Sequence, residues 1–118
     1  MTRKETLAKL IAKVEVGSED TPDFSALVSR PIMQCKAGEA YRGSLDAAKA
    51  LHEAVLPGFT LWQITRVNDN FVMVSVCDIP RVKGAWLEPS YRGESPDSPA
   101  RAWLLAILRA LHSMEPDA

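Results

Sequence analysis

The sequence predicts a mixed α+β fold, in which helices pack on a three-stranded antiparallel sheet in the order α-α-α-β-β-β-α. In four segments, apolar residues recur at intervals of three and four residues, which is typical of amphipathic helices. Before the last of these segments come three short segments rich in β-branched and aromatic residues, which is typical of a strand meander. Because 118 residues is the length of one domain, we expect a single domain over residues 1–118.

Three helices are predicted before the strands, at residues 2–16, 22–30 and 44–56. Thr2 and Glu5 have the spacing of a capping box at the start of the first helix.

The second helix is expected to be short, because Pro31 limits it to about eight residues. Residues 31–43 show no clean period, and within them residues 36–39 are interpreted as a loop. Ser44 is the predicted N-cap of the third helix, and Pro57-Gly58 follows its end.

Strands are predicted at residues 59–67, 71–77 and 85–87. The turn residues 68–70 join the first two strands into a hairpin. Residues 90–97 are interpreted as a linker to the last helix.

The first strand looks apolar on both faces, because Phe59 and Leu61 alternate with Trp62 and Ile64. The second face of the sheet should therefore be covered. Either the N-terminal helix lies on it, which gives an alpha-beta-alpha sandwich, or another subunit does.

The last helix is predicted at residues 98–113, with Ser98 as its N-cap and Pro99 at its first helical position. Its apolar residues form one wide face. They are Ala100, Trp103, Leu104, Ile107, Leu108 and Leu111. A helix this apolar requires cover from earlier parts of the chain.

Composition excludes several classes of protein. The chain has 14 basic and 15 acidic side chains, a net charge of −1, so no overall charge attracts nucleic acid or an anionic membrane. No apolar run approaches the length of about 20 residues that spans a bilayer, and the N-terminus lacks the apolar core of a signal peptide. Cys35 and Cys77 have no motif spacing. We expect a cytoplasmic protein with reduced cysteines and no membrane partner.

No catalytic, metal or cofactor site is predicted. His52 and His112 lack a second ligand at metal spacing, and His52 is expected on a helix flank. No nucleophile elbow or glycine-rich phosphate loop is present. We therefore expect that the protein is not an enzyme.

Tryptophans are the remaining candidates for a binding surface. Trp62 and Trp103 are expected in the core. Trp86, together with Tyr91, could form an exposed interaction patch. Alternatively, Trp86 covers the end of the last helix.

Three stretches of the sequence resemble a family of small phage and prophage proteins, the phage ABA sandwich domain. They are residues 41–48 (YRGSLDAA), 56–62 (LPGFTLW) and 98–110 (SPARAWLLAILRA), and the shorter stretch 86–88 also fits. The resemblance implies an alpha-beta-alpha sandwich encoded by a phage or prophage of a bacterial host, with no established activity.

A second resemblance concerns only the order of elements, since helix, three antiparallel strands and helix is also the order of the double-stranded-RNA-binding domain. That domain holds phosphates with lysines at the start of its last helix. Here Asp97 stands in that position, with Arg101 as the one cation, while Arg81 and Lys83 lie in the predicted loop between the second and third strands.

The sequence thus indicates a non-enzymatic phage or prophage accessory protein that acts through protein contacts, with a protein partner or as a homo-oligomer. The alternative is a weak nucleic-acid-binding module that uses Arg81, Lys83 and Arg101.

Overall fold

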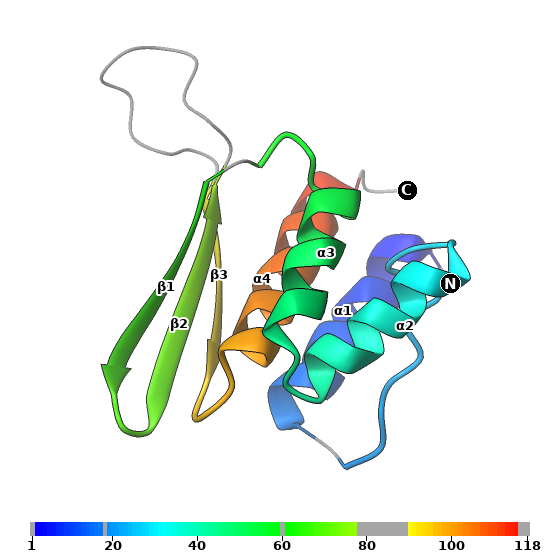
Figure 1. Ribbon diagram of the computed structural model, residues 1–118. Coiled ribbons are helices and arrows are strands. Elements are labelled where there is room, and N and C mark those ends of the chain that lie inside the picture. The colour runs from blue at the N-terminus through cyan, green and yellow to red at the C-terminus, as the bar shows by residue number, and fades with distance from the viewer. Residues whose placement is uncertain (1, 18, 60, 78–89, 116–118) are drawn as a thin grey trace, which may run out of the picture.

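The computed structural model describes residues 2–17, 19–59, 61–77 and 90–115 of the chain. In these residues the chain forms four helices and three strands in the order α-α-α-β-β-β-α, which confirms the predicted fold class (Figure 1). The elements are α1 (Arg3–Val16), α2 (Pro31–Tyr41), α3 (Leu45–Val55), β1 (Leu61–Asn68), β2 (Phe71–Cys77), β3 (Ser90–Ser95) and α4 (Pro99–Met114). None of the helices in the described residues is long and apolar enough to cross a membrane.

The sheet is antiparallel with the strand order β1-β2-β3. A tight turn joins β1 to β2, and the backbone N–H of Asn70 donates to the side-chain oxygen of Asn68 at 2.8 Å. The register of β1 on β2 is regular from Leu61 to Arg66 and is then interrupted by a bulge before Asn68. A bulge of this kind locally increases the twist of a hairpin.

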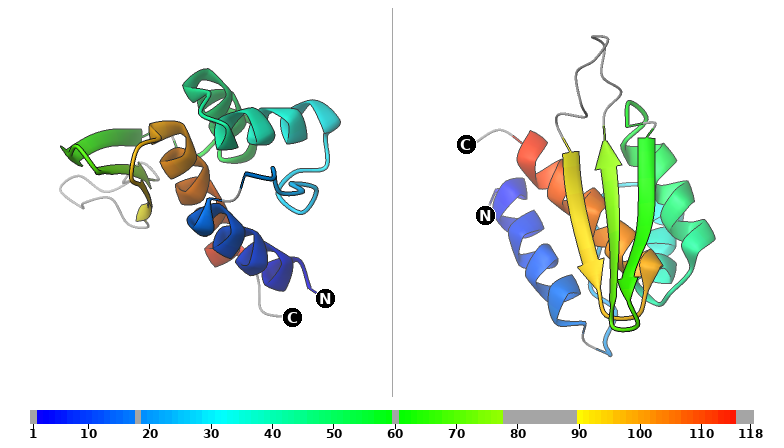
Figure 2. Two further views of the ribbon diagram at one scale, coloured as in Figure 1. Left: turned by 90° about the horizontal axis from the view of Figure 1, so that it is seen from below. Right: turned by 90° about the vertical axis from the view of Figure 1, so that its left-hand side faces the viewer.

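α4 is the central element of the molecule. One of its sides packs against β2 and β3, and its other sides pack against α1, α2 and α3. All four helices of the described chain lie on one face of the sheet (Figure 2). The N-terminal helix α1 packs on α4 rather than on the second face of the sheet, so the helices do not enclose the sheet from both sides.

The second face of the sheet is mostly polar, which differs from the predicted apolar pattern. The register places six side chains of two cross-strand rows on this face: Gln63, Ser75 and Arg92, and Thr65, Met73 and Glu94. Phe59 precedes β1 and is buried, so it does not contribute to this face. An antiparallel sheet can leave such polar rows to solvent, whereas Cys77, in the row at the other end of this face, is buried.

The predicted helix at residues 22–30 is wrong, because this segment forms only a turn at residues 25–27. Its apolar residues Phe24 and Leu27 are buried, so they anchor the connector to the core without helical backbone. A helix begins at Pro31, where the sequence predicted an end. Proline suits the first helical position because its missing N–H would have no partner there.

The third strand lies at 90–95, where a linker was predicted, so that prediction is wrong. The predicted strand at 85–87 lies outside the described residues. β3 is an edge strand, and the register directs only Tyr91, Gly93 and Ser95 toward the helices. Of these three positions only Tyr91 carries a large side chain, so the sequence of β3 does not alternate between apolar and polar residues and gave no signal of a strand.

The other elements begin and end within two residues of the predicted positions. Each of α1, α3 and α4 starts at a predicted cap, because the hydroxyls of Thr2, Ser44 and Ser98 accept hydrogen bonds from backbone N–H groups of the first turn.

Candidate interaction surface

β1 presents a large apolar side chain that the helices do not fully cover. α4 packs against β2 and β3, whereas β1 lies farther from it (Figure 1). Trp62 points to the helix side of the sheet, because it pairs with the buried Val76, yet 42% of its surface is exposed. Its ring packs on Trp103 of α4, with 4.5 Å between ring centroids. Trp62 is therefore only partly in the core, whereas Trp103 is buried as predicted.

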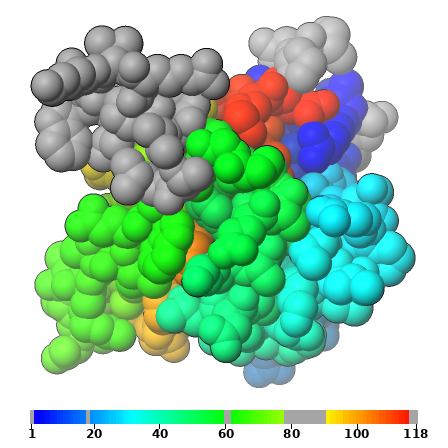
Figure 3. Space-filling model, turned by 45° about the horizontal axis from the view of Figure 1, so that its top comes forward, coloured from blue at the N-terminus to red at the C-terminus, as the bar shows by residue number. Residues whose placement is uncertain are grey.

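A cavity of about 270 Å³ lies beside Trp62, where α3 leads into β1. We name it the β1–α3 groove and define it by His52, Glu53, Leu56, Pro57, Phe59 and Trp62. Figure 3 shows the strands and α3 as separate ridges, with α4 visible between them. The groove therefore combines two aromatic walls with one carboxylate, that of Glu53.

His52 forms the buried back of the groove and links three parts of the chain. The indole N–H of Trp103 donates to Nδ1 of His52 at 3.0 Å, so Nδ1 is unprotonated. Nε2 then carries the proton and donates to the backbone carbonyl of Phe59. Because both ring nitrogens are used, His52 acts as a connector between α3, α4 and the entry to β1, and neither nitrogen is available to a ligand.

The predicted place of His52, on a helix flank, is wrong. His52 follows Leu51 and lies four residues after Ala48, and all three side chains are buried. The helical spacing of Ala48 and His52 could have indicated burial. The bond to Trp103 could not have been found, since it joins residues that are far apart in the sequence.

The two edges of the sheet differ in how they are protected. On β3, the Arg109 guanidinium donates to the carbonyl of Arg92 at 2.7 Å and to the Glu94 carboxylate at 2.9 Å, and it also pairs with Glu15 of α1 at 3.1 Å. On β1, the only side-chain hydrogen bond to a strand carbonyl within the described residues is a 3.5 Å contact from Arg66 to the Asn68 carbonyl. Among the described strands, β1 pairs with β2 alone. Within residues 61–77 and 90–115, no strand pairs with the other long edge of β1, and this edge is where another strand can add.

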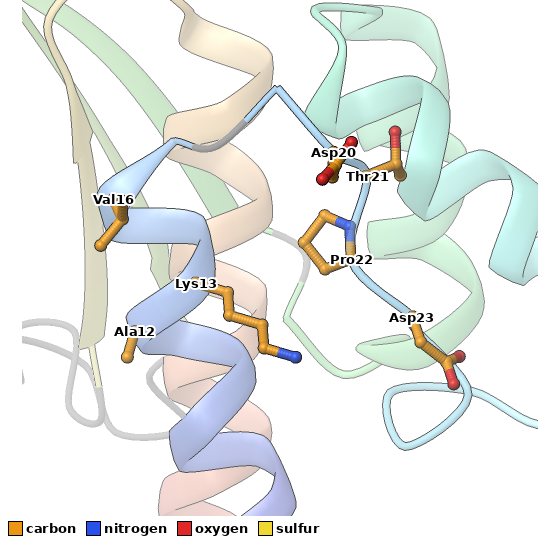
Figure 4. Close-up of a pocket in the computed structure, with 7 residues that line it drawn as sticks. All are labelled: Ala12, Lys13, Val16, Asp20, Thr21, Pro22 and Asp23. Atoms are coloured by element: carbon orange, nitrogen blue, oxygen red, sulfur yellow. The ribbon is translucent and has the colours of Figure 1, made fainter.

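A second hollow, of about 470 Å³, lies between α1 and the connector that follows it. Figure 4 shows Lys13 reaching from α1 toward Pro22, while Asp23 points away from the helix. The backbone N–H of Ser25 donates to the Asp23 carboxylate at 2.9 Å, and this bond, more than the nearby Lys13 ammonium, lowers the pKa of Asp23 below its ordinary value. The Asp23 carboxylate therefore stabilises the turn that follows it.

Arg101, the one predicted nucleic-acid contact among the described residues, is engaged inside the molecule. Its Nε and Nη2 donate to the backbone carbonyl of Tyr41 at 3.1 and 3.0 Å, and its guanidinium carbon lies 4.4 Å from the centroid of the Tyr41 ring. It joins α4 to the end of α2. Arg81 and Lys83 lie outside the described residues.

Tyr91, the described half of the predicted Trp86 and Tyr91 patch, is half-buried on the helix side of β3. Its hydroxyl donates to the Ser113 hydroxyl at 3.1 Å, and its ring centroid lies 6.0 Å from that of Phe59. Trp86 lies outside the described residues. Within the part that is described, Tyr91 joins the sheet to α4.

Groups of three or more His, Cys, Asp or Glu side chains that could hold a metal ion do not occur within the described ranges. Cys35 and Cys77 form no disulfide.

Comparison of the chain with models of protein families, with curated proteins and with solved structures gives no match.

Proposed function

We propose that this chain is a non-enzymatic protein-interaction module that binds a partner protein in the β1–α3 groove. Trp62 carries this proposal, because a half-exposed tryptophan beside a cavity is the kind of residue that supplies most of the binding energy at protein interfaces. The hydrogen bond from Trp103 to His52 holds the Trp103 ring in place, and Trp62 packs on that ring. A rigid aromatic wall loses little conformational entropy when a partner binds.

The sequence resemblance supports a biological setting for this module. The stretches 41–48, 56–62 and 98–110 resemble the phage ABA sandwich domain. We therefore place the protein among phage or prophage accessory proteins, acting in the cytoplasm of the bacterial host.

A separate partner protein has more support than a second copy of the chain. Self-association was expected from an apolar second face of the sheet, and the two central rows of that face carry five polar side chains beside one apolar one, Met73. Nucleic-acid binding has less support, because Arg101 is bonded to Tyr41.

Selection from a peptide display library against the immobilised protein tests the proposal. Trp62→Ala and Val67→Ala form a matched pair, since each truncates an exposed apolar side chain of β1 and only Trp62 lines the groove. We expect peptides that bind the wild type and Val67→Ala but bind Trp62→Ala at least about tenfold more weakly. Circular dichroism checks that both variants are folded. Failure to enrich any peptide, or equal binding to Trp62→Ala, would contradict the proposal.

A further inference from the structure

The open edge of β1 runs beside the β1–α3 groove, and together they specify the form of the partner. We propose that the partner contributes an extended segment that adds to β1 as a fourth strand, antiparallel to it, and that places an arginine or lysine side chain in the groove. This inference rests on the proposed function, because it names the kind of partner that the same surface binds.

The backbone of β1 is suited to pairing. Its register is regular from Leu61 to Arg66, and it contains no proline and no lysine, which are residues that commonly protect edge strands. The edge of β3 is instead closed by Arg109. A partner strand can therefore form main-chain hydrogen bonds along about six residues of β1, a length of roughly 20 Å. Antiparallel pairing continues the pattern of the existing sheet.

α3 determines which side of an added strand is recognised. Figure 2 shows α3 extending past β1 on the helix side of the sheet. A strand placed about 4.8 Å from β1 would lie over α3. Every second side chain of that strand would then face the helix side, next to Trp62, Ile64 and Arg66 of β1, and the others would face solvent.

The side chains of Trp62, Ile64 and Arg66, on the helix side of β1, determine which partner side chains can bind next to them. At the groove end, the aromatic rings of Trp62 and Phe59 suit the aliphatic stem of an arginine or lysine, and Glu53 suits its charge. No ion pair engages Glu53 within the described residues. Ile64, in the middle, suits an aliphatic residue. Arg66, exposed at the other end, suits an acidic residue.

In an antiparallel segment these three residues occur in the order acidic, aliphatic, basic, at alternate positions. The span from Trp62 to Arg66 is about 13 Å, which equals the distance between the first and fifth residues of a strand. The groove volume of about 270 Å³ admits a single long side chain, so one basic residue anchors the segment.

A nine-residue peptide with Glu, Val and Arg at alternate central positions, and Thr elsewhere, tests this inference by fluorescence anisotropy. We expect binding that weakens about tenfold in Glu53→Gln. Asp46→Asn is the matched control, because Asp46 is an exposed carboxylate of the same helix that does not line the groove, and it should leave binding unchanged. The peptide of reversed sequence, and one N-methylated at alternate backbone positions, should each bind at least about tenfold more weakly.

Amide hydrogen exchange measured on β1 separates this inference from the proposed function. Bound peptide should slow the exchange of alternate β1 amides, because they become donors to the new strand. If display-selected peptides depend on Trp62 but neither slow β1 amides nor respond to Glu53→Gln, the added strand is wrong and the binding function stands. If no peptide depends on Trp62, both are overturned. Equal binding of the reversed peptide overturns the antiparallel strand.

Discussion

Gly93 is the residue at which β3 and α4 approach most closely. A Cβ atom on Gly93 would lie 1.9 Å from the carbonyl oxygen of Ala102 and 2.6 Å from the backbone nitrogen of Ala106. Glycine on the strand and alanine on the helix let two backbones pack together without intervening side chains. Two other single residues also connect α4 to its neighbours. Arg101 of α4 donates to the Tyr41 carbonyl of α2, and His52 of α3 accepts from the Trp103 indole of α4.

Gly93→Ala should therefore lower the free energy of unfolding by about 1–3 kcal/mol, because the backbone of α4 would have to move away from β3. Urea unfolding followed by circular dichroism measures the loss. Gly58→Ala is the control, because nothing lies within 4 Å of a Cβ atom placed there, and it should change stability by less than about 0.5 kcal/mol. Equal stabilities of the two variants would show that β3 and α4 are not in such close contact.

At the scale of elements, the same cap chemistry has different consequences at α1 and α4. The hydroxyl of Ser98 accepts from the backbone N–H of Arg101 at 3.1 Å, and that of Thr2 accepts from the N–H of Glu5 at the same distance. α4 packs against three helices and two strands, whereas α1 packs chiefly against α4. The start of α4 is therefore connected to the whole core, whereas the start of α1 is held chiefly by the bonds of Arg3 to the carbonyls of Ala26 and Leu27 and to the Glu115 carboxylate.

Ser98→Ala should lower the global free energy of unfolding by about 1 kcal/mol, the usual cost of a lost N-cap. Thr2→Ala should instead speed amide exchange only in the first turn of α1, because local fraying costs less than unfolding the core. Ser98→Asp retains an acceptor and should stay close to the wild type. A Thr2→Ala variant that lost as much global stability as Ser98→Ala would contradict this difference between the helices.

The elements that the sequence predicted well are those with strong periodic signals. α1, α3 and α4 have caps and apolar faces, and β1 and β2 have a turn between two runs of β-formers. α2 and β3 were missed because tertiary contacts define them. α2 buries small residues such as Ala37 and Gly38, and β3 is a polar edge strand packed against α4 through Gly93. Neither leaves an apolar period in the sequence.

The candidate surface could be predicted only in part. Trp62 was identified as a large apolar residue of a strand, but its exposure depends on how far α4 extends under the sheet. Local periodicity carries no information about that distance. The open edge of β1 likewise depends on strand order, which only the assembled sheet determines.

At the scale of the whole molecule, charge distinguishes the proposed function from nucleic-acid binding. The net charge is −1, and the guanidinium groups of Arg3, Arg101 and Arg109 all donate hydrogen bonds within the molecule. The 14 basic side chains are balanced by 15 acidic ones, so no excess of positive charge is available to neutralise phosphates, and phosphate contacts supply most nucleic-acid affinity.

An electrophoretic mobility shift with double-stranded RNA or DNA at low salt should consequently show no complex. A basic double-stranded-RNA-binding domain serves as the positive control for the probe. A shift that is lost in an Arg81→Ala, Lys83→Ala double variant, and is abolished by moderate salt, would contradict this expectation and support the nucleic-acid alternative.

The central position of α4 also has a consequence for how the protein is made. The six other described elements precede α4 in the chain, so they leave the ribosome before it. Until α4 emerges, β2 and β3 have no helix to cover Val74 and Val76, and α1 and α3 have no common surface on which to dock. A ribosome that stalls before Pro99 would hold a chain in which the faces of α1, α3, β2 and β3 that α4 covers are exposed together, which makes it a target for chaperones and proteases. Completion of one helix converts that vulnerable nascent chain into a folded protein.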